Sequence, residues 1–249
     1  MATSYGPQYP GIEDGLIFCF DPKNRKCWRG DTTIYNMPSL DSALGVSLSG
    51  SSVNIELSGD EWDGALTTKG YIEFDGTDDY ISMNPNTGTT GPFALQEFTV
   101  SCWVEPVMPS TGGGWNSYLF FNMDAGEVNG WSLMISLYPK LRAYDSGGAK
   151  EAVGPADIPS VQWYNYTGVK QATGLSNNLS LYQDGAIGPT VVTCTDITYA
   201  ATTYTPQMGS NAGGKELEGK LGPVMIWNRA LSAAEILTNY NRLKGRFGL

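Results

Sequence analysis

The stretch FDGTDDY, residues 74–80, places three carboxylates, those of Asp75, Asp78 and Asp79, within five positions. It is flanked by YIEF at 71–74 and YISM at 80–83, and such aromatic and β-branched runs favour strands. Asp-Gly between two such runs is a turn signal, because glycine tolerates a positive φ and aspartate accepts hydrogen bonds from nearby backbone. The stretch is therefore predicted to be a corner between two strands, with a metal site or an acidic catalytic cluster as the alternatives.

Short strand-like runs recur along the rest of the chain. The clearest is FTVSCWV at 98–104, in which alternate residues are apolar and share one face. A second Asp-Gly, at 184–185, predicts a hairpin that joins 179–183 to 187–194. The other strands are expected at 15–20, 46–48, 53–57, 118–122, 131–137, 141–144, 163–169 and 221–227. With Gly and Pro at the breaks, this pattern predicts an all-β sandwich or jelly roll rather than βαβ units.

One helix is expected close to the C-terminus. Ser232 and Glu235 have the spacing of a capping box, in which each side chain bonds the backbone of the other residue. Ile236, Tyr240 and Leu243 follow at helical spacing, and Gly245 suits the position just after the last turn.

The composition excludes several classes of function. The 249 residues carry a net charge of −10, which disfavours a nucleic acid partner. There is no histidine, and the four cysteines form no CxxC pair, so a zinc site is not expected. Cys102 and Cys194 lie in strand-like runs and are expected to be buried thiols. The sequence leaves open whether Cys19 and Cys27 form a disulfide.

The chain is predicted to hold one domain, residues 15–249, after an extended arm of residues 1–14 that is rich in Pro, Gly and Tyr. No stretch reaches the ~20 apolar residues that a membrane-spanning helix needs. The first residues lack the basic and apolar regions of a signal peptide, so we expect synthesis in a host cytoplasm.

Five segments, taken in order, resemble one known superfamily. They are GLIFCFDPKNRKCWRGDTT at 15–33, YIEFDGTDDYISM at 71–83, FTVSCWVEP at 98–106, LSLYQDG at 179–185 and KELEGKLGPVMIWNRALSAAEILTNYN at 215–241. Together they resemble the laminin-G-like, concanavalin A-like lectin/glucanase superfamily. The part DPKNRKCWRGDTTIYN, at 21–36, is similar to a variant found in virion proteins of tailed phages and marine viruses.

The resemblance implies a jelly roll of two antiparallel sheets, in a family whose members mostly bind carbohydrate or protein ligands. Some members hydrolyse glycosidic bonds with carboxylates in an E-x-D-x-E pattern on one strand, where period two puts all three on one face. No such pattern occurs here, and Glu56, Glu73, Glu97, Glu105, Glu127 and Glu151 all stand without such partners. Without histidine, Ser–His and Cys–His nucleophiles are excluded too. We therefore expect a protein that is not an enzyme.

Many members of the superfamily also hold one calcium ion. The resemblance makes Asp78 and Asp79 the candidate calcium ligands, because a hard cation prefers carboxylate oxygens. Several relatives carry an Asp or Glu near the position of Gly222 and Pro223, and this sequence lacks it.

Glycan-binding sites combine an aromatic ring with amide or carboxylate groups, because the ring packs on the C–H face of a sugar. The candidates are Trp115, Asn116 and Tyr118 in one loop and Trp62 and Asp63 in another, with Asn129-Gly130-Trp131 as a similar stretch. The alternative for each tryptophan is packing within the sandwich, to which we assign Trp103 and Trp227.

We therefore expect a non-enzymatic surface protein of a virus particle, most simply a phage decoration, knob or tail-associated protein. Its arm, residues 1–14, would contact other virion proteins or sister subunits, and its loops would bind a host-surface glycan. Two alternatives remain: an extracellular, cellular carbohydrate-binding lectin module, and a glycoside hydrolase with an unfamiliar carboxylate pair.

Overall fold

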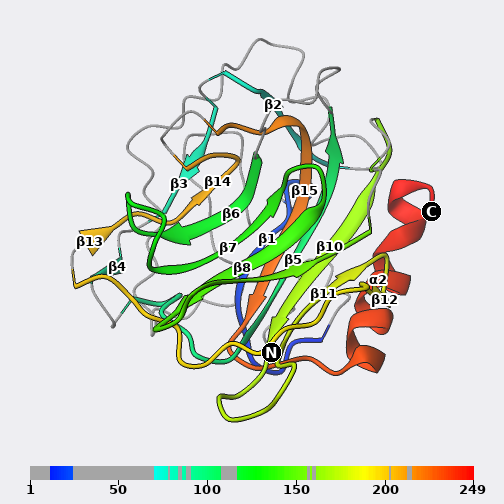
Figure 1. The fold of residues 1–249 in the computed structure, drawn as a ribbon. Coiled ribbons are helices and arrows are strands. Elements are labelled where there is room, and N and C mark those ends of the chain that lie inside the picture. The colour runs from blue at the N-terminus through cyan, green and yellow to red at the C-terminus, as the bar shows by residue number, and fades with distance from the viewer. Residues whose placement is uncertain are drawn as a thin grey trace, which may run out of the picture.

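The protein is a sandwich of two antiparallel sheets with one helix against it (Figure 1). The computed structural model describes residues 12–24, 70–77, 79–83, 86–87, 91–107, 117–155, 158, 161–201, 203–211 and 215–249. All the features below belong to these residues.

The first sheet has seven strands. They follow the order β1 (Leu16–Phe20), β15 (Glu218–Trp227), β5 (Phe98–Pro106), β10 (Tyr164–Lys170), β11 (Leu179–Gln183) and β12 (Ala186–Ile187), with β2 (Ile72–Asp75) also paired to β15.

The second sheet has six strands. They follow the order β3 (Ile81–Ser82), β14 (Gln207–Met208), β6 (Ser117–Met123), β7 (Gly130–Ile135), β8 (Pro139–Asp145) and β9 (Gly148–Val153). A small separate pair joins β4 (Asn86–Thr87) to β13 (Thr203–Tyr204). The two-sheet antiparallel fold is the one that the sequence predicted.

The main core lies between the two sheets. Alternation along the strands directs Val100 and Cys102 of β5 toward Leu133 of β7 and Leu141 of β8 in one buried cluster. Aromatic rings fill its centre, where Trp131 stacks on Phe98 and on Phe120 at centroid distances of 4.3 and 5.2 Å. The burial of Cys102 and Cys194 as free thiols confirms the expectation for these two residues. Cys27 lies outside the described residues, so its pairing with Cys19 stays open.

The FDGTDDY stretch is a corner, as predicted, and it carries the chain from one sheet to the other. Strand β2 before it pairs with β15, whereas β3 after it pairs with β14. Gly76 has a φ of 78°, and the amide of Thr77 donates to Asp75 Oδ1 at 2.7 Å. The buried carboxylate of Asp79 accepts from the Asp75 amide at 2.9 Å, so this side chain closes the turn. Asp78 lies outside the described residues.

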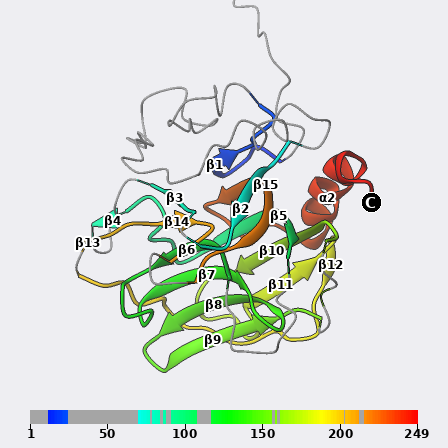
Figure 2. The same cartoon turned by 90° about the horizontal axis from the view of Figure 1, so that it is seen from above.

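Helix α2 (Ala233–Phe247) covers the outer face of the seven-stranded sheet (Figure 2). Its buried residues Ile236, Leu243 and Phe247 pack with Trp103 and Trp227 of the sheet, as expected for these two tryptophans. The capping box of Ser232 is present as predicted. Of the helices in the described part, none is long and apolar enough to cross a bilayer.

The predicted end of this helix at Gly245 is wrong. The helix continues to Phe247, and Gly248 takes the left-handed conformation at φ 81°. The extra turn places the Phe247 ring against Trp103 and Trp163, each at 4.4 Å between centroids. Burial of a large aromatic ring outweighs the weak preference of Gly245 for a helix end.

The hairpin at Asp184 and Gly185 is confirmed, since both residues have positive φ between β11 and β12. The strand expected at 187–194 is wrong beyond Ile187, and only a single bridge from Val192 to Leu179 follows. Strand β9 was missed because its GAKEAV sequence is poor in β-branched residues. The strands expected at 46–48 and 53–57 lie outside the described residues.

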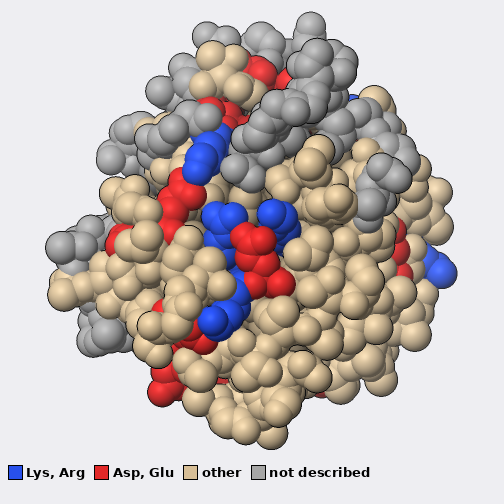
Figure 3. Space-filling model, viewed as in Figure 1, with Lys and Arg blue, Asp and Glu red and all other residues tan. Residues whose placement is uncertain are grey.

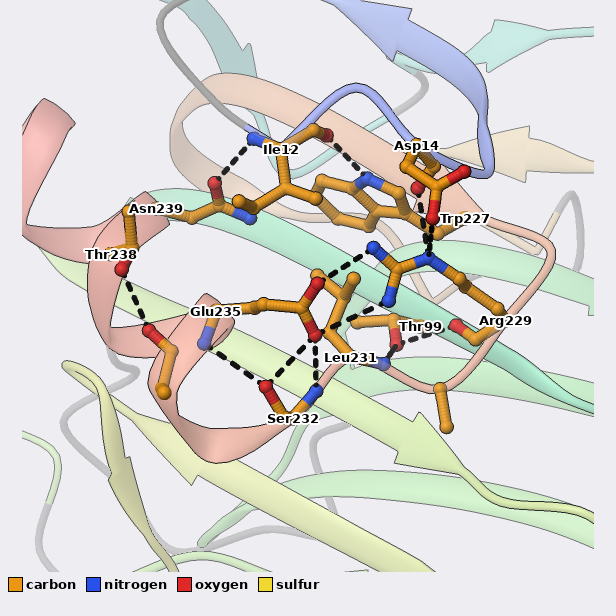
Figure 4. A network of polar contacts seen from close by, with 12 residues as sticks. Ile12, Asp14, Thr99, Trp227, Arg229, Leu231, Ser232, Glu235, Thr238 and Asn239 are labelled. Carbon is orange, nitrogen blue, oxygen red and sulfur yellow. Dashed lines mark hydrogen bonds and ion pairs between the residues drawn. The ribbon is translucent and has the colours of Figure 1, made fainter.

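Residues 12–14 bind to the middle of α2, to β15 and to Arg229 in the connection between them (Figure 4). The amide of Ile12 donates to Asn239 Oδ1 at 2.9 Å, and its carbonyl accepts from Trp227 Nε1 at 2.7 Å. The carbonyl of Asp14 accepts from Arg229 Nε at 2.9 Å. Residues 12–14 thus contact the sandwich, and the arm expected at 1–14 stays a prediction for the residues before them.

Arg229 also pairs with Glu235, and this pair makes the stability of the protein depend on pH. Hydrogen bonds from Arg229 and from the Ser232 amide lower the pKa of Glu235 to about 2, against 4.5 for the free side chain. A carboxylate with a depressed pKa in the folded state stabilises fully above pH 4.5, and this stabilisation is lost as the pH falls toward 2. We expect Glu235→Gln to lower the free energy of unfolding by about 1 kcal/mol at pH 7.

The difference in the free energy of unfolding between Glu235→Gln and the parent protein should shrink as the pH approaches 2. Urea unfolding at pH 7, 4 and 2.5 would measure it. Glu13→Gln is the control, because Glu13 is exposed. A Glu235→Gln difference that is equally large at pH 7 and 2.5 would contradict the assignment.

Candidate functional site

A row of side chains crosses five strands on the outer face of the six-stranded sheet. The register places Gln207 of β14 opposite Phe121 of β6, Phe121 opposite Ser132 of β7, Ser132 opposite Arg142 of β8, and Arg142 opposite Glu151 of β9. Residues directly opposite each other in a ladder point to the same face. Their neighbours along the strands, such as Leu133, Leu141 and Ala152, point the other way into the main core. The cross-strand row therefore faces away from the core.

Ion pairs connect the β8–β9 end of this row. Arg142 Nε and Nη2 both lie on Glu151 Oε1, at 2.7 and 2.6 Å, and Lys140 Nζ lies 3.3 Å from Glu151 Oε2. Each of the three side chains keeps between 17 and 28% of its surface exposed, so a ligand can reach them from solvent. Figure 3 shows Lys and Arg lying directly against Asp and Glu in the middle of this view.

Glu127 comes from the turn between β6 and β7 and reaches over the same face. Tyr118 donates its hydroxyl to Glu127 Oε2 at 2.7 Å, while Asn211 Nδ2 and Lys215 Nζ lie 2.6 and 2.5 Å from Oε1. Arg142 Nη1 is 3.9 Å from Glu127 Oε2. Glu127 has a φ of 54°, a conformation that non-glycine residues seldom adopt and that often marks functional positions. We call Glu127, Lys140, Arg142, Glu151 and Lys215 the charged cluster.

The electrostatics keep both carboxylates of the charged cluster ionised. Burial alone would raise the pKa of Glu127, but hydrogen bonds from Lys215 and Tyr118 outweigh it and lower that pKa. Burial also opposes ionisation of Glu151, and the hydrogen bond and charge of Arg142 reverse the effect and lower its pKa. Burial and the neighbouring Glu127 raise the pKa of the Tyr118 hydroxyl. The cluster thus presents fixed charges and a neutral phenol at neutral pH.

Beneath the charged cluster, two polar atoms of the row are buried without a hydrogen-bond partner among the described residues. They are Ser132 Oγ and Gln207 Oε1. A buried polar atom of this kind costs free energy unless a water or a ligand supplies a partner. Tyr144, two residues beyond Arg142 on β8, is half-buried on the same face and packs against the buried group of Tyr118, Phe121, Met123 and Met134. The site therefore combines charges, polar groups and an aromatic ring.

Of the predicted glycan-binding residues, the described part holds Tyr118, Asn129 and Trp131. Tyr118 is buried in β6 and contacts the charged cluster through its hydroxyl. Asn129 donates its side-chain amide to Asp124 Oδ2 at 2.7 Å, and Trp131 has no exposed surface and packs in the main core. Trp115, Asn116, Trp62 and Asp63 lie outside the described residues, so their role stays a prediction. Among the described residues, no group of three carboxylate, Cys or His side chains has the geometry of a metal site, and calcium binding also stays a prediction.

The charged cluster was not predicted from the sequence. Glu127 and Glu151 lie outside any E-x-D-x-E pattern, and the structure brings both of them to Arg142. Alternation of Lys140, Arg142 and Tyr144 with buried Leu141 and Ala143 along β8 was the available signal. Such alternation predicts which side chains of β8 point outward, but it does not predict which strands lie beside β8.

Comparison with known proteins places the chain in a family. The sequence profile of the concanavalin A-like lectin/glucanases superfamily, laminin G type, matches residues 75–237. A search of the curated proteins finds no match.

Two solved structures with TM-scores above 0.5 support the same fold. The binding domain of Paraclostridial Mosquitocidal Protein 1 is 15% identical with a TM-score of 0.57, and the match covers 92% of this chain and 52% of that one. The HCR/D fragment, in a point-mutant form, is 14% identical with a TM-score of 0.58 over 92% of this chain and 51% of that one. Domain 4 of the arabinanase AbnA from Geobacillus stearothermophilus is 16% identical with a TM-score of 0.47, over 68% and 76% of the two chains.

The chain spans about half the length of the first two structures. At these identities the likeness concerns the fold, which is lectin-like. Because the family profile covers well over half of the sequence, this chain belongs to the concanavalin A-like lectin/glucanases superfamily.

Proposed function

We propose that this protein is a non-enzymatic, lectin-like binding protein that holds a glycan on the outer face of the six-stranded sheet. The observation that carries the proposal is the charged cluster above the cross-strand row. Carboxylate, guanidinium and ammonium groups make the strong, directional hydrogen bonds that fix sugar hydroxyls. Tyr144 adds an aromatic surface beside them. The family includes lectins, and the Paraclostridial neighbour is named a binding domain, which agrees with a binding role.

Binding is favoured over hydrolysis by the charge state of the two carboxylates. A glycosidase needs one carboxyl group whose pKa is raised, so that it is protonated and can donate to the leaving oxygen. Glu127 and Glu151 both have lowered pKa values, because cations hydrogen-bond to each of them. This pair is suited to accept hydrogen bonds from a bound sugar.

Arg142→Ala tests the site. We expect the parent protein to bind members of a glycan array, and the variant to bind them at least tenfold more weakly, about 1.4 kcal/mol. Arg142 contacts both carboxylates. Its loss therefore removes a hydrogen-bond donor and no longer holds the side chains of Glu127 and Glu151 in position. Isothermal titration calorimetry with the best array ligand measures the change.

Lys220→Ala is the matched control for Arg142→Ala. Lys220 pairs with Glu105 at 2.7 Å on the seven-stranded sheet, with similar exposure, and should leave binding unchanged. An equal loss in both variants would place the ligand elsewhere, and a parent protein that binds no glycan would overturn the proposal.

We also propose that the protein is displayed on a virus particle, where the part of the predicted arm before Ile12 contacts another virion protein or a sister subunit. This part rests on the similarity of residues 21–36 to a viral variant of the family and on the arm-like composition of the N-terminus. Mass spectrometry of purified particles tests it. A fixed stoichiometry per particle is the expected result, and recovery of the chain only as free protein would contradict it.

A further inference from the structure

The charged cluster holds three cations and two carboxylates, with Glu151 shared by two of the cations, and the pairing of these groups indicates which class of glycan fits. Every cation in it already has a carboxylate within reach: Lys140 and Arg142 lie on Glu151, and Lys215 lies on Glu127. In the middle of Figure 3, Lys and Arg side chains (blue) lie beside Asp and Glu side chains (red) and form no separate basic patch. No described cation of this face is left to pair with an anionic ligand.

The guanidinium of Arg142 is the group best shaped to bind the carboxylate or sulfate of an acidic sugar. Its Nε and Nη2 both lie on Glu151 Oε1, and its Nη1 faces Glu127 Oε2. An anionic group could reach it only by displacing Glu151, and it would then lie beside two ionised carboxylates. Like charges at such short distances repel strongly where solvent is partly excluded. The chain's net charge of −10 adds repulsion at longer range.

A neutral hydroxyl meets no such barrier, because it donates and accepts at the same time. Each ion pair presents a carboxylate oxygen and an ammonium or guanidinium N–H side by side, as Glu151 and Lys140 do at 3.3 Å. A pair of neighbouring hydroxyl groups can donate to the first and accept from the second without breaking the pair. The hydrogen bonds formed in this way are charge-assisted on both sides.

We propose that the charged cluster selects neutral, hydroxyl-rich saccharides, and that Glu151 and Glu127 exclude acidic ones. This inference rests on the proposed function, since it assumes that the ligand of this face is a glycan. It assigns the two carboxylates a role in specificity that is separate from their ion pairs within the fold.

The experiment uses an array in which each neutral oligosaccharide is printed beside a sulfated or uronic acid form of the same backbone. The parent protein should bind neutral members at least tenfold better than their acidic counterparts. Its binding should be nearly independent of salt between 20 and about 300 mM NaCl, because no net charge is neutralised. Better binding of the acidic forms, weakening with salt, would overturn the inference and leave the proposed glycan-binding function standing.

Glu151→Gln sharpens the test, because it keeps the side-chain shape and leaves Lys140 and Arg142 without their carboxylate. We expect this variant to gain at least tenfold in binding to acidic glycans. Glu105→Gln is the matched control: it removes the same charge from the pair with Lys220 on the seven-stranded sheet, and it should gain nothing. An equal gain in both variants would assign the effect to overall charge and overturn the inference.

The wild-type comparison decides the question even if Glu151→Gln folds poorly. Binding of neither neutral nor acidic glycans by the parent protein would overturn the proposed function, and the inference with it.

Discussion

Trp131→Ala is expected to lower the free energy of unfolding by about 3–5 kcal/mol, the range typical of truncating a buried aromatic side chain. Trp131 has no exposed surface, and its ring stacks on Phe98 of the opposite sheet and on Phe120 of the neighbouring strand. Its indole N–H also donates to the carbonyl of Phe93 at 3.0 Å. Removing it leaves a cavity where the two sheets meet. Urea unfolding followed by circular dichroism measures the loss.

Val128→Ala, in the turn just before Trp131, is the control for this prediction. Val128 is 54% exposed, so its truncation should change stability by about 0.5 kcal/mol or less. If Trp131→Ala also cost less than about 1 kcal/mol, the stacked rings would not be the centre of the core. Because Ser132 follows Trp131 on β7, weaker glycan binding by Trp131→Ala would reflect the damaged sheet and not a contact with the ligand.

Arg246→Ala is the second change with a large expected effect, a loss of about 2–4 kcal/mol. The guanidinium of Arg246, near the end of α2, donates to both oxygens of Asp21 at 2.8 and 2.7 Å, and to the Gly70 carbonyl at 2.9 Å. Only 12 and 13% of the two side chains is exposed. Removal of Arg246 therefore leaves a carboxylate largely buried without its counter-charge, which costs more than the pair itself contributes. Thermal and urea unfolding measure the loss.

The double variant Asp21→Asn with Arg246→Ala separates these two effects. It also removes the charge of Asp21 that Arg246→Ala leaves without a counter-charge, so it should recover part of the stability that Arg246→Ala loses. A double variant that is less stable than Arg246→Ala would contradict this explanation. Glycan binding should be unchanged in the folded fraction, because Arg246 belongs to α2, which packs on the seven-stranded sheet, whereas the charged cluster lies on the outer face of the six-stranded sheet.

The elements that the sequence predicted correctly are formed by interactions between residues that lie close together in the sequence. The FDGTDDY corner needs only a glycine at positive φ and nearby carboxylates to close it. The hairpin at Asp184 and Gly185 and the capping box of Ser232 are equally local. Alternation along FTVSCWV predicted a half-buried strand for the same reason, since its period is a property of the backbone. The strand is confirmed, but both of its faces are buried, because α2 covers the outer one. Five such segments in order were sufficient to indicate the family.

The errors lie where packing outweighs local preference. Gly245 has the character of a helix end, but the contact of Phe247 with Trp103 and Trp163 extends α2 past it. The segment after Ile187 has strand-like residues, yet it finds a partner strand only at the single bridge of Val192. Neither outcome can be derived from the segments themselves.

The sequence by itself therefore determined the class of fold and the family, and its acidic composition already disfavoured a nucleic acid partner. Only the tertiary structure decided the candidate site. Glu127 and Lys215 are 88 residues apart in the chain, and Gln207 meets Phe121 through the register of two strands from distant segments. Strand alternation says which side chains point outward, but the order and register of the strands decide which outward side chains become neighbours. A site built across five strands exists only once those strands have paired.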